Sequence, residues 1–307
     1  MPNLFFFSTT ILLFSLINSI ICQTISARRN AGCALISNSI YCYGGIPIKG
    51  DQSLNVQHIR FDLQQLHGIT DLDDSKIRWV MVPDVINSTQ AIVKPRGYQA
   101  SAVATSDNSY VMYGGVAGDS FLNYNPQSYT WRTLQVDPNV NLTNRNTVVN
   151  MGNDMFWLWG GENFPDFTKY LQNVANIYDY KAAKWVNRIV EDSAPMRIEN
   201  TGTLGRDGSI YILGGATRYP DGNFSYSNFN EVRKFDTKSS QWSYFNATGH
   251  IASPRVSHTA TQLPNKNQLL IYGGINSDPA YLAAHNGQRK ITFNCIFIVV
   301  IVNDVVL

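Results

Sequence analysis

Five segments of the chain share one pattern, a short apolar run that ends in a glycine doublet. They read IYCYGG (40–45), YVMYGG (110–115), FWLWGG (156–161), IYILGG (210–215) and LLIYGG (269–274). The doublets are Gly44–Gly45, Gly114–Gly115, Gly160–Gly161, Gly214–Gly215 and Gly273–Gly274, so successive intervals run from 46 residues (114 to 160) to 70 (44 to 114). Apolar runs of this length predict buried strands, and repetition at this period is typical of propellers, solenoids and repeat arrays.

A second element follows three of the doublets, an aromatic residue with a tryptophan seven positions later. These pairs are Tyr124 and Trp131, Tyr178 and Trp185, and Phe235 and Trp242. In the first unit Phe61-Asp62 fits the front of this element, but Trp79 comes eighteen residues later, so we predict an insertion that includes the polar segment 71–76. A third element opens several units, as Pro95-Arg96, Pro195-Met-Arg197 and Pro254-Arg255-Val-Ser-His258.

These three elements, in register over about residues 28–275, resemble the kelch repeat. The resemblance implies an all-β fold, a kelch-type β-propeller of four-stranded antiparallel blades, with about five blades visible and the last one incomplete. It implies an apolar first strand that faces the central channel, and doublets with positive φ. It also implies that the Asp after the aromatic residue accepts N–H bonds in a turn, and that Trp131, Trp185 and Trp242 pack between blades. We interpret all these repeat residues as structural.

The first segment is typical of an export signal. Residues 5–22 read FFFSTTILLFSLINSIIC, a short apolar stretch at the N-terminus, as in a secretory signal peptide. The residues before it carry no positive side chain, and Arg28-Arg29 lies beyond it, so an uncleaved membrane anchor stays an alternative. We predict a signal peptide at 1–22, a propeller at 23–275, and a secreted or cell-surface protein.

If the protein is exported, two further features of the sequence predict covalent modifications. Four sequons predict N-glycosylation, at Asn87, Asn141, Asn223 and Asn246. The loop after a doublet and the connection after a fourth strand emerge at the same end of a blade, so we expect all four on one face. Cys33 and Cys42 flank LISNSI, a strand–turn–strand pattern that places them opposite each other. In an oxidising compartment this predicts a disulfide, the alternative being two buried thiols.

The end of the chain departs from the repeat. Residues 276–307 lack the expected aromatic-Asp turn and Trp, and the apolar run at 296–302 is too short to span a bilayer. Two interpretations stay open: a truncated or mis-spliced gene model, or a genuine strand that pairs with an open blade. We favour the first, which makes 276–307 an irregular tail after an incomplete fifth blade.

Composition and cysteine usage exclude several classes of function. The formal charge is +2, from 24 basic and 22 acidic residues, which predicts no nucleic-acid partner. Some secreted kelch propellers resemble galactose oxidase, a copper enzyme with Tyr and His ligands and a Cys linked to a Tyr. Here Cys22, Cys33, Cys42 and Cys295 leave no cysteine for that link, and the five His show no ligand spacing. We predict no catalytic residue, no cofactor and no metal site, and a structural or solvent-facing role for His258.

The loops after the doublets are the candidate binding elements, since binding residues concentrate on loops that a rigid scaffold positions. The long ones span 46–57, 162–173 and 216–229, and they carry Tyr, Phe and Asn, as in RYPDGNFSYSNF. Such side chains suit neutral polar ligands. The leading prediction is a non-catalytic protein-interaction propeller; the alternatives are a carbohydrate-binding propeller and, less favoured, an enzyme like galactose oxidase.

Overall fold

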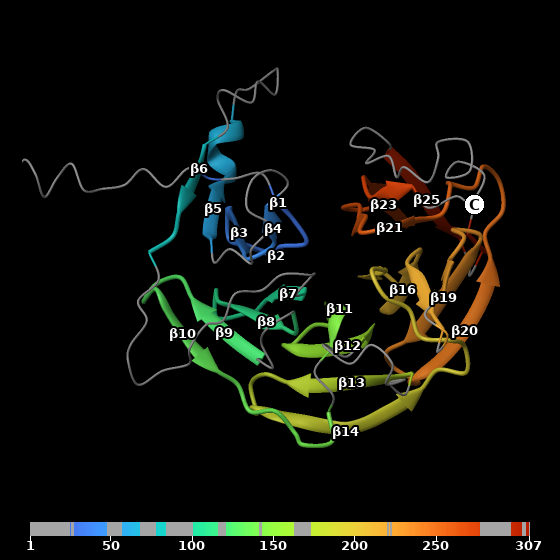
Figure 1. The fold of residues 1–307 in the computed structure, drawn as a ribbon, viewed down its shortest axis with the longest axis horizontal. Coiled ribbons are helices and arrows are strands. Elements are labelled where there is room, and N and C mark those ends of the chain that lie inside the picture. Colours follow the sequence, from blue (N-terminus) through green and yellow to red (C-terminus); the bar gives the residue numbers. More distant parts are fainter. Residues whose placement is uncertain are drawn as a thin grey trace, which may run out of the picture.

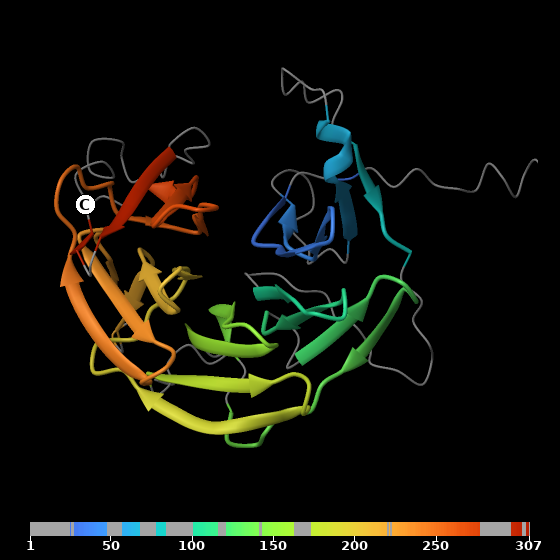
Figure 2. The ribbon, with the colours of Figure 1, turned by 180° about the vertical axis from the view of Figure 1, so that it is seen from behind.

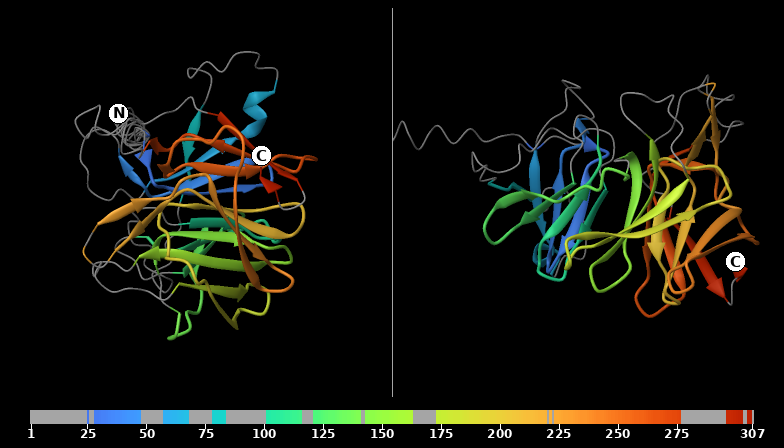
Figure 3. Two further views of the ribbon diagram at one scale, coloured as in Figure 1. Left: turned by 90° about the vertical axis from the view of Figure 1, so that its right-hand side faces the viewer. Right: turned by 90° about the horizontal axis from the view of Figure 1, so that it is seen from below.

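The computed structural model describes residues 25, 28–47, 57–67, 78–83, 101–115, 121–140, 143–162, 173–219, 221, 223–276, 296–302 and 305–306. Five antiparallel sheets of four strands each form the blades, which follow one another around an arc (Figures 1 and 2). Figure 3 shows the same blades from the side and from below. The predicted all-β propeller is confirmed.

Within each blade the first strand is innermost and the fourth is outermost. Blade one contains β2 (Gly32–Ile36), β3 (Ser39–Tyr43), β5 (His58–Asp62) and β6 (Trp79–Met81). Blade two contains β7 (Ser101–Ala104), β8 (Tyr110–Tyr113), β9 (Phe121–Asn125) and β10 (Thr130–Thr133). Blade three contains β11 (Asn144–Asn150), β12 (Met155–Glu162), β13 (Val174–Asp179) and β14 (Lys184–Glu191). Blade four contains β15 (Thr201–Leu204), β16 (Ser209–Leu213), β19 (Glu231–Asp236) and β20 (Gln241–Asn246). Blade five contains β22 (Thr259–Gln262), β23 (Gln268–Tyr272), β25 (Ile296–Val302) and β26 (Val305–Val306).

Three short ribbons and one 3₁₀ turn lie outside the four-stranded sheets. Three two-stranded ribbons lie outside the four-stranded sheets: β1 (Arg28–Arg29) with β4 (Ile46–Pro47), β17 (Ala216–Arg218) with β18 (Phe224–Tyr226), and β21 (Arg255–Val256) with β24 (Ile275–Asn276). A 3₁₀ turn, η1 (Leu63–Leu66), follows β5. It lies in the insertion predicted between Phe61 and Trp79, and these two residues pair across β5 and β6.

The first strands face the axis of the arc, because β2, β7, β11, β15 and β22 contact one another in that order. Their predicted apolar character holds for β2, which reads GCALI, but is wrong for β11, which reads NRNTVVN, and for β15, which reads TGTL. Hydroxyl groups here bind the neighbouring blade: Ser101 Oγ donates to the carbonyl of Asn146 (2.7 Å), and Thr147 Oγ1 donates to that of Asn200 (3.2 Å). Polar residues suit this position because buried backbone carbonyls need donors, which apolar side chains lack.

The glycine doublets behave as predicted, with positive φ at both glycines of all five. Gly114 shows a second reason for glycine. A Cβ added there would overlap the carbonyl oxygen of Thr143, where the chain enters blade three. The doublet therefore lets the second strand of one blade approach the opening segment of the next.

The repeat tryptophans fill the spaces between blades, as predicted. Each packs against the aromatic residue just before the previous blade's doublet. The three pairs, with the separations of their ring centroids, are Trp131–Tyr43 (5.0 Å), Trp185–Tyr113 (6.5 Å) and Trp242–Trp159 (5.6 Å).

The turn between the third and fourth strands also follows the prediction. A carboxylate oxygen of Asp179 accepts a backbone N–H at 2.9 Å, and one of Asp236 accepts another at 2.8 Å. In blade two the same place holds Asn125, whose Oδ1 accepts a backbone N–H at 2.8 Å. A side-chain oxygen that caps the following residues is the common element of these turns.

The apolar run 296–302 forms a strand of blade five. β25 pairs antiparallel with β23 along its length, from Tyr272 opposite Ile296 to Gln268 opposite Val300, and β26 pairs with β25. Blade five thus has four strands in the structure, and the boundary predicted at 275 does not separate an irregular tail from it. This pairing is what the second interpretation requires. A truncated or mis-spliced gene model concerns the transcript and stays a prediction.

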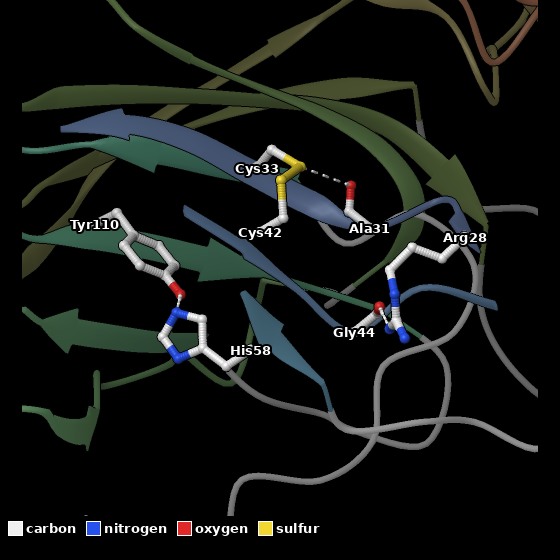
Figure 4. The surroundings of a disulfide bond; sticks show 7 residues. All are labelled: Arg28, Ala31, Cys33, Cys42, Gly44, His58 and Tyr110. Atoms are coloured by element: carbon white, nitrogen blue, oxygen red, sulfur yellow. Dashed lines mark hydrogen bonds between the residues drawn. A yellow bond between two sulfur atoms is a disulfide. The ribbon is translucent and has the colours of Figure 1, made fainter. Parts of the chain in front are cut away.

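The first hairpin carries the predicted disulfide. Cys33 and Cys42 are direct partners in the register of β2 and β3, and their sulfur atoms are bonded (Figure 4). Their Cα atoms lie 4.1 Å apart, the spacing of a close cross-strand pair.

Candidate functional site

The five doublets lie at one end of the blades, which we call the Gly-Gly face. After Gly214–Gly215, β17 and β18 form a hairpin outside the sheet of blade four. At its tip the N–H of Tyr219 donates to the carbonyl of Asn223 (2.9 Å). Tyr219 is 41% exposed and Phe224 is 40% exposed, and the Arg218 guanidinium lies over the Phe224 ring, 5.3 Å from its centroid. The hairpin therefore presents two aromatic rings at the Gly-Gly face.

A network of charged side chains connects this hairpin to the inner strands. Glu162, the last residue of β12, pairs with Arg145 (3.1 Å) and with Arg218 (3.2 Å). Arg145 also pairs with Glu199 (3.3 Å), which accepts a hydrogen bond from the hydroxyl of Ser257 (2.9 Å). Glu162 is buried, whereas Arg145 and Arg218 are partly exposed. The shared carboxylate therefore fixes where the two guanidinium groups lie.

Backbone geometry brings this network together. Arg145, Glu199 and Ser257 lie near the start of the first strand of three successive blades, with φ of 55°, 53° and 54°. The N–H of Glu199 donates to the carbonyl of Arg145 (3.0 Å), and the N–H of Ser257 donates to that of Glu199 (3.2 Å). The left-handed conformation costs about 1–3 kcal/mol at a residue other than glycine, and these inter-blade hydrogen bonds offset it.

The arginine of the Pro-Arg element has a role that the sequence analysis missed. Two of these arginines donate to the carbonyl of the first glycine of their own blade's doublet, Arg197 to Gly214 (3.3 Å) and Arg255 to Gly273 (2.8 Å). Arg28, which belongs to no Pro-Arg element, donates in the same way to Gly44 in blade one (Figure 4). In blade three the hydroxyl of Thr143 takes this place, 3.0 Å from the carbonyl of Gly160. The signal in the sequence is the near-constant separation of 16 to 18 residues between the arginine and its glycine.

The same residues also bind the preceding blade through their backbone. The carbonyl of Arg197 accepts the N–H of Gly161 (3.0 Å), and the carbonyl of Arg255 accepts the N–H of Gly215 (3.1 Å). One arginine therefore holds the doublet of its own blade with its side chain and that of the previous blade with its carbonyl. We call this arrangement the arginine clasp.

An ion network in which Arg197, Arg233 and Asp192 are buried and Glu231 is half-exposed stabilises the boundary of blades three and four. Arg233 pairs with Asp192 (3.1 Å), both buried, and its guanidinium lies over the Trp159 ring, 5.4 Å from the centroid. Glu231 pairs with both Arg197 and Arg233. Burial, followed by the charge of Arg233, lowers the pKa of Arg197 to about 10, and burial raises the pKa of Asp192. Since removing one partner of a buried ion pair costs about 3–5 kcal/mol, we assign this network a structural role.

Two histidines in the described part of the chain, His58 and His258, are buried and serve packing. The Nε2 atom of His258 lies 3.0 Å from Thr201 Oγ1, and burial, with the charge of Arg255, lowers the pKa of His258 to about 3. Of the two roles predicted for His258 the structural one holds. The Nε2 atom of His58 lies 2.9 Å from the hydroxyl of Tyr110 (Figure 4). Within the part of the chain that the structure describes, no three His, Cys, Asp or Glu residues gather as a metal ion would require.

Two of the four sequons fall within the described residues. Asn223 is exposed at the tip of the β17–β18 hairpin, and Asn246 is exposed at the end of β20. Asn246 is opposite Glu231, the first residue of β19, where the chain returns from the loop after the doublet. Both therefore lie at the Gly-Gly face, as expected. Asn87 and Asn141 lie outside the described residues, so their placement stays a prediction.

Several other predictions also fall outside the described residues. They concern residues 1–22, the polar insertion 71–76, Pro95-Arg96, Cys295, and most of the loops 46–57 and 162–173. In the described ranges the chain forms no helix with the length and hydrophobicity that crossing a membrane requires.

A comparison with known families matches most of the chain. The family model described as the KLHDC2/KLHL20/DRC7 Kelch-repeats domain matches residues 33–274. This range begins in β2 and ends at the doublet of blade five, so it includes all five glycine doublets and the three repeat tryptophans.

Proposed function

Since the chain belongs to the kelch-repeat propeller family, we propose that it is an exported, non-catalytic interaction propeller that binds a polypeptide segment at its Gly-Gly face. Kelch-repeat domains are typically non-catalytic modules that bind proteins. Export is proposed from the apolar stretch 5–22. The Cys33–Cys42 disulfide supports it, because disulfides persist in oxidising compartments.

The observation that carries the binding proposal is the β17–β18 hairpin, with Tyr219 and Phe224 exposed beside Arg218. Tyr and Arg are enriched among the residues that dominate the energy of protein interfaces. Arg218 is held by Glu162 and lies over Phe224. Side chains that are ordered before binding lose less entropy when a partner binds.

A paired substitution tests this site. Full-length tagged protein, wild type or with Tyr219→Ser and Phe224→Ser together, is cross-linked on the cells that export it, and its partners are identified by mass spectrometry. We expect the polypeptide partners of the wild type to be lost from the double variant.

The matched control is Tyr129→Ser. Tyr129 is 44% exposed in the turn between β9 and β10, at the end opposite the Gly-Gly face, and Ser240 occupies the equivalent turn position in blade four. This variant should keep the wild-type partners. Partners that are retained by both variants, or lost from both, would refute the assignment to the hairpin.

Two alternatives are tested with the same proteins. The exposed rings of Tyr219 and Phe224 also suit carbohydrate, and binding to a glycan array that only the double variant loses would favour a carbohydrate ligand. Purified protein given copper and galactose should release no hydrogen peroxide. Peroxide release in proportion to bound copper would overturn the non-catalytic assignment.

Export and glycosylation are tested by expression of the full chain in eukaryotic cells. The protein should reach the medium or the cell surface, and glycosidase treatment should lower its mass. Asn223→Gln and Asn246→Gln should each remove one glycan. A chain that stays in the cytosol with unmodified asparagines and free thiols would overturn this part of the proposal.

A further inference from the structure

The β17–β18 hairpin has two faces that carry different side chains. Arg218 and Phe224 are partners in the register of the two strands and lie on one face, where the guanidinium lies over the ring. Neighbouring residues of a strand point to opposite faces, so Tyr219 and Asn223 lie on the other. We call these the Phe224 face and the Tyr219 face of the hairpin.

Tyr219 and Asn223 lie opposite each other at the tip of the hairpin. The N–H of Tyr219 donates to the carbonyl of Asn223 at 2.9 Å, which continues the pairing of Arg218 with Phe224 by one position. The Cβ atoms of two such opposite residues are about 4.5–5.5 Å apart. Both residues are exposed. Any group attached to the amide of Asn223 therefore begins beside the Tyr219 ring.

Asn223 is also the first residue of a sequon, Asn223-Phe224-Ser225, whose Asn and Ser are both exposed. Asp221 holds the side chain of this asparagine. Its two carboxylate oxygens accept the Nδ2 amide of Asn223 at 2.7 Å and the backbone N–H of Asn223 at 2.9 Å. An N-linked sugar replaces one of the two hydrogens on Nδ2, so the nitrogen keeps one hydrogen with which to donate to Asp221.

We infer that a glycan on Asn223 packs its first sugar against the Tyr219 ring and leaves the Phe224 face as the surface that a polypeptide partner contacts. The inference rests on the proposed export, because sequons are glycosylated in secreted proteins. The C–H groups of a sugar ring are attracted to the negative face of an aromatic ring, and their contact removes apolar surface from water.

The chemistry of the two faces agrees with this division. The Tyr219 face also carries Ser225, whose exposed side chain offers a hydroxyl group to a neutral sugar. The Phe224 face carries Arg218, which Glu162 holds at 3.2 Å, and arginine is enriched among the residues that dominate the energy of protein interfaces. The glycan therefore determines which of the two exposed rings a partner reaches.

Nitration of tyrosine tests the contact without any partner. Full-length protein, exported from cells that make only high-mannose glycans, is treated with tetranitromethane, and mass spectrometry follows Tyr219 and Tyr129. Ser225→Ala removes the sequon and keeps the asparagine, whereas Asn246→Gln removes a different glycan. Tyr219 should react several-fold more slowly in the wild type and in Asn246→Gln than in Ser225→Ala, and Tyr129 should react equally in all three. Trimming the glycan at Asn223 to a single N-acetylglucosamine should preserve the protection.

The other results overturn the inference in distinguishable ways. Equal nitration of Tyr219 with and without the glycan at Asn223 overturns the contact and leaves the proposed export in place. Protection that disappears on trimming means that the outer sugars shield the ring, so the first sugar does not pack on it. An exported wild type that carries no glycan at Asn223 overturns the inference alone, whereas a chain that stays in the cytosol overturns the export as well.

Single variants test the division of the two faces by the cross-linking described above. In glycosylated protein, Phe224→Ser should lose the polypeptide partners and Tyr219→Ser should retain them. Loss from Tyr219→Ser overturns the division, and so does retention by Phe224→Ser when the double variant loses the partners. Retention by both single variants and by the double variant overturns the proposed binding function instead, and the nitration result still decides whether the glycan covers Tyr219.

Discussion

Truncating Trp131 to alanine should weaken the fold more than the loss of any exposed aromatic residue. Trp131 is buried at the junction of blades one and two, with ring centroids 5.0 Å from Tyr43, 4.8 Å from Tyr124 and 5.6 Å from His58. Tyr43 and His58 belong to blade one, so the cavity left by truncation opens across the interface and neither blade can fill it alone.

The expected magnitude follows from burial. Replacing a buried Trp by Ala costs about 3–5 kcal/mol, through lost transfer energy and the cavity that remains. Since folded proteins are stable by about 5–15 kcal/mol in total, this is about 30–50% of the free energy of unfolding at the midpoint of that range. Trp131→Phe keeps an aromatic ring in the space and should cost less.

Urea unfolding, followed by circular dichroism on disulfide-intact protein, measures the change. The control is Tyr129→Ala, because Tyr129 is 44% exposed and Ala183 occupies the same turn position in blade three; it should change stability by about 0.5 kcal/mol or less. If Trp131→Ala shifts the unfolding midpoint no further than this control does, the tryptophan is not the inter-blade anchor described above.

Three further predictions test separate features. Gly114→Ala should destabilise the fold far more than Gly152→Ala. Both glycines have positive φ, but an added Cβ would overlap a carbonyl oxygen at Gly114 and would meet nothing within 4 Å at Gly152. Equal melting temperatures of the two variants would contradict the close approach at Gly114. Replacing Cys33 and Cys42 together by serine should cost about 2–3 kcal/mol of stability, from a loop whose ends are 9 residues apart, and an unchanged unfolding midpoint would argue against the bond. His258 has a folded pKa of about 3 against an ordinary 6.5, so it contributes stability above pH 6.5 that is lost as the pH falls towards 3. His258→Gln should make the free energy of unfolding depend less on pH between 6.5 and 3. An unaltered pH dependence would mean that another group causes it.

Features that repeat locally were predictable from the sequence. The doublets, the capping Asp and the seven-residue interval before Trp131 each reflect geometry within one blade, so the pattern recurs wherever the geometry does. The insertion before Trp79 was visible because it interrupts that interval. The Cys33–Cys42 pairing was visible because a hairpin relates residues close in sequence.

Features that depend on neighbouring blades were not predictable. The charged network joins residues that lie far apart in the chain, and no short sequence pattern indicates that they come together: Arg145, Glu162, Glu199 and Arg218. The polar inner strands were misjudged for the same reason, since their hydroxyls bind the carbonyls of another blade. β25 was left outside the repeat because its sequence lacks every repeat residue and only its pairing with β23 assigns it to blade five.

The arginine clasp has a consequence for biosynthesis. Gly161 is bound by Arg197, 36 residues later, and Gly215 by Arg255, 40 residues later. At a translation rate of about 5–20 residues per second, a finished second strand waits roughly 2–8 seconds before the residue that fastens its doublet is made. During that interval the doublet at the end of the strand lacks its inter-blade hydrogen bond, which forms only when the opening segment of the next blade has been synthesised. Assembly therefore advances from the N-terminus with a lag of one blade, and a ribosome that stalls at a blade's opening segment leaves the blade before it unfinished.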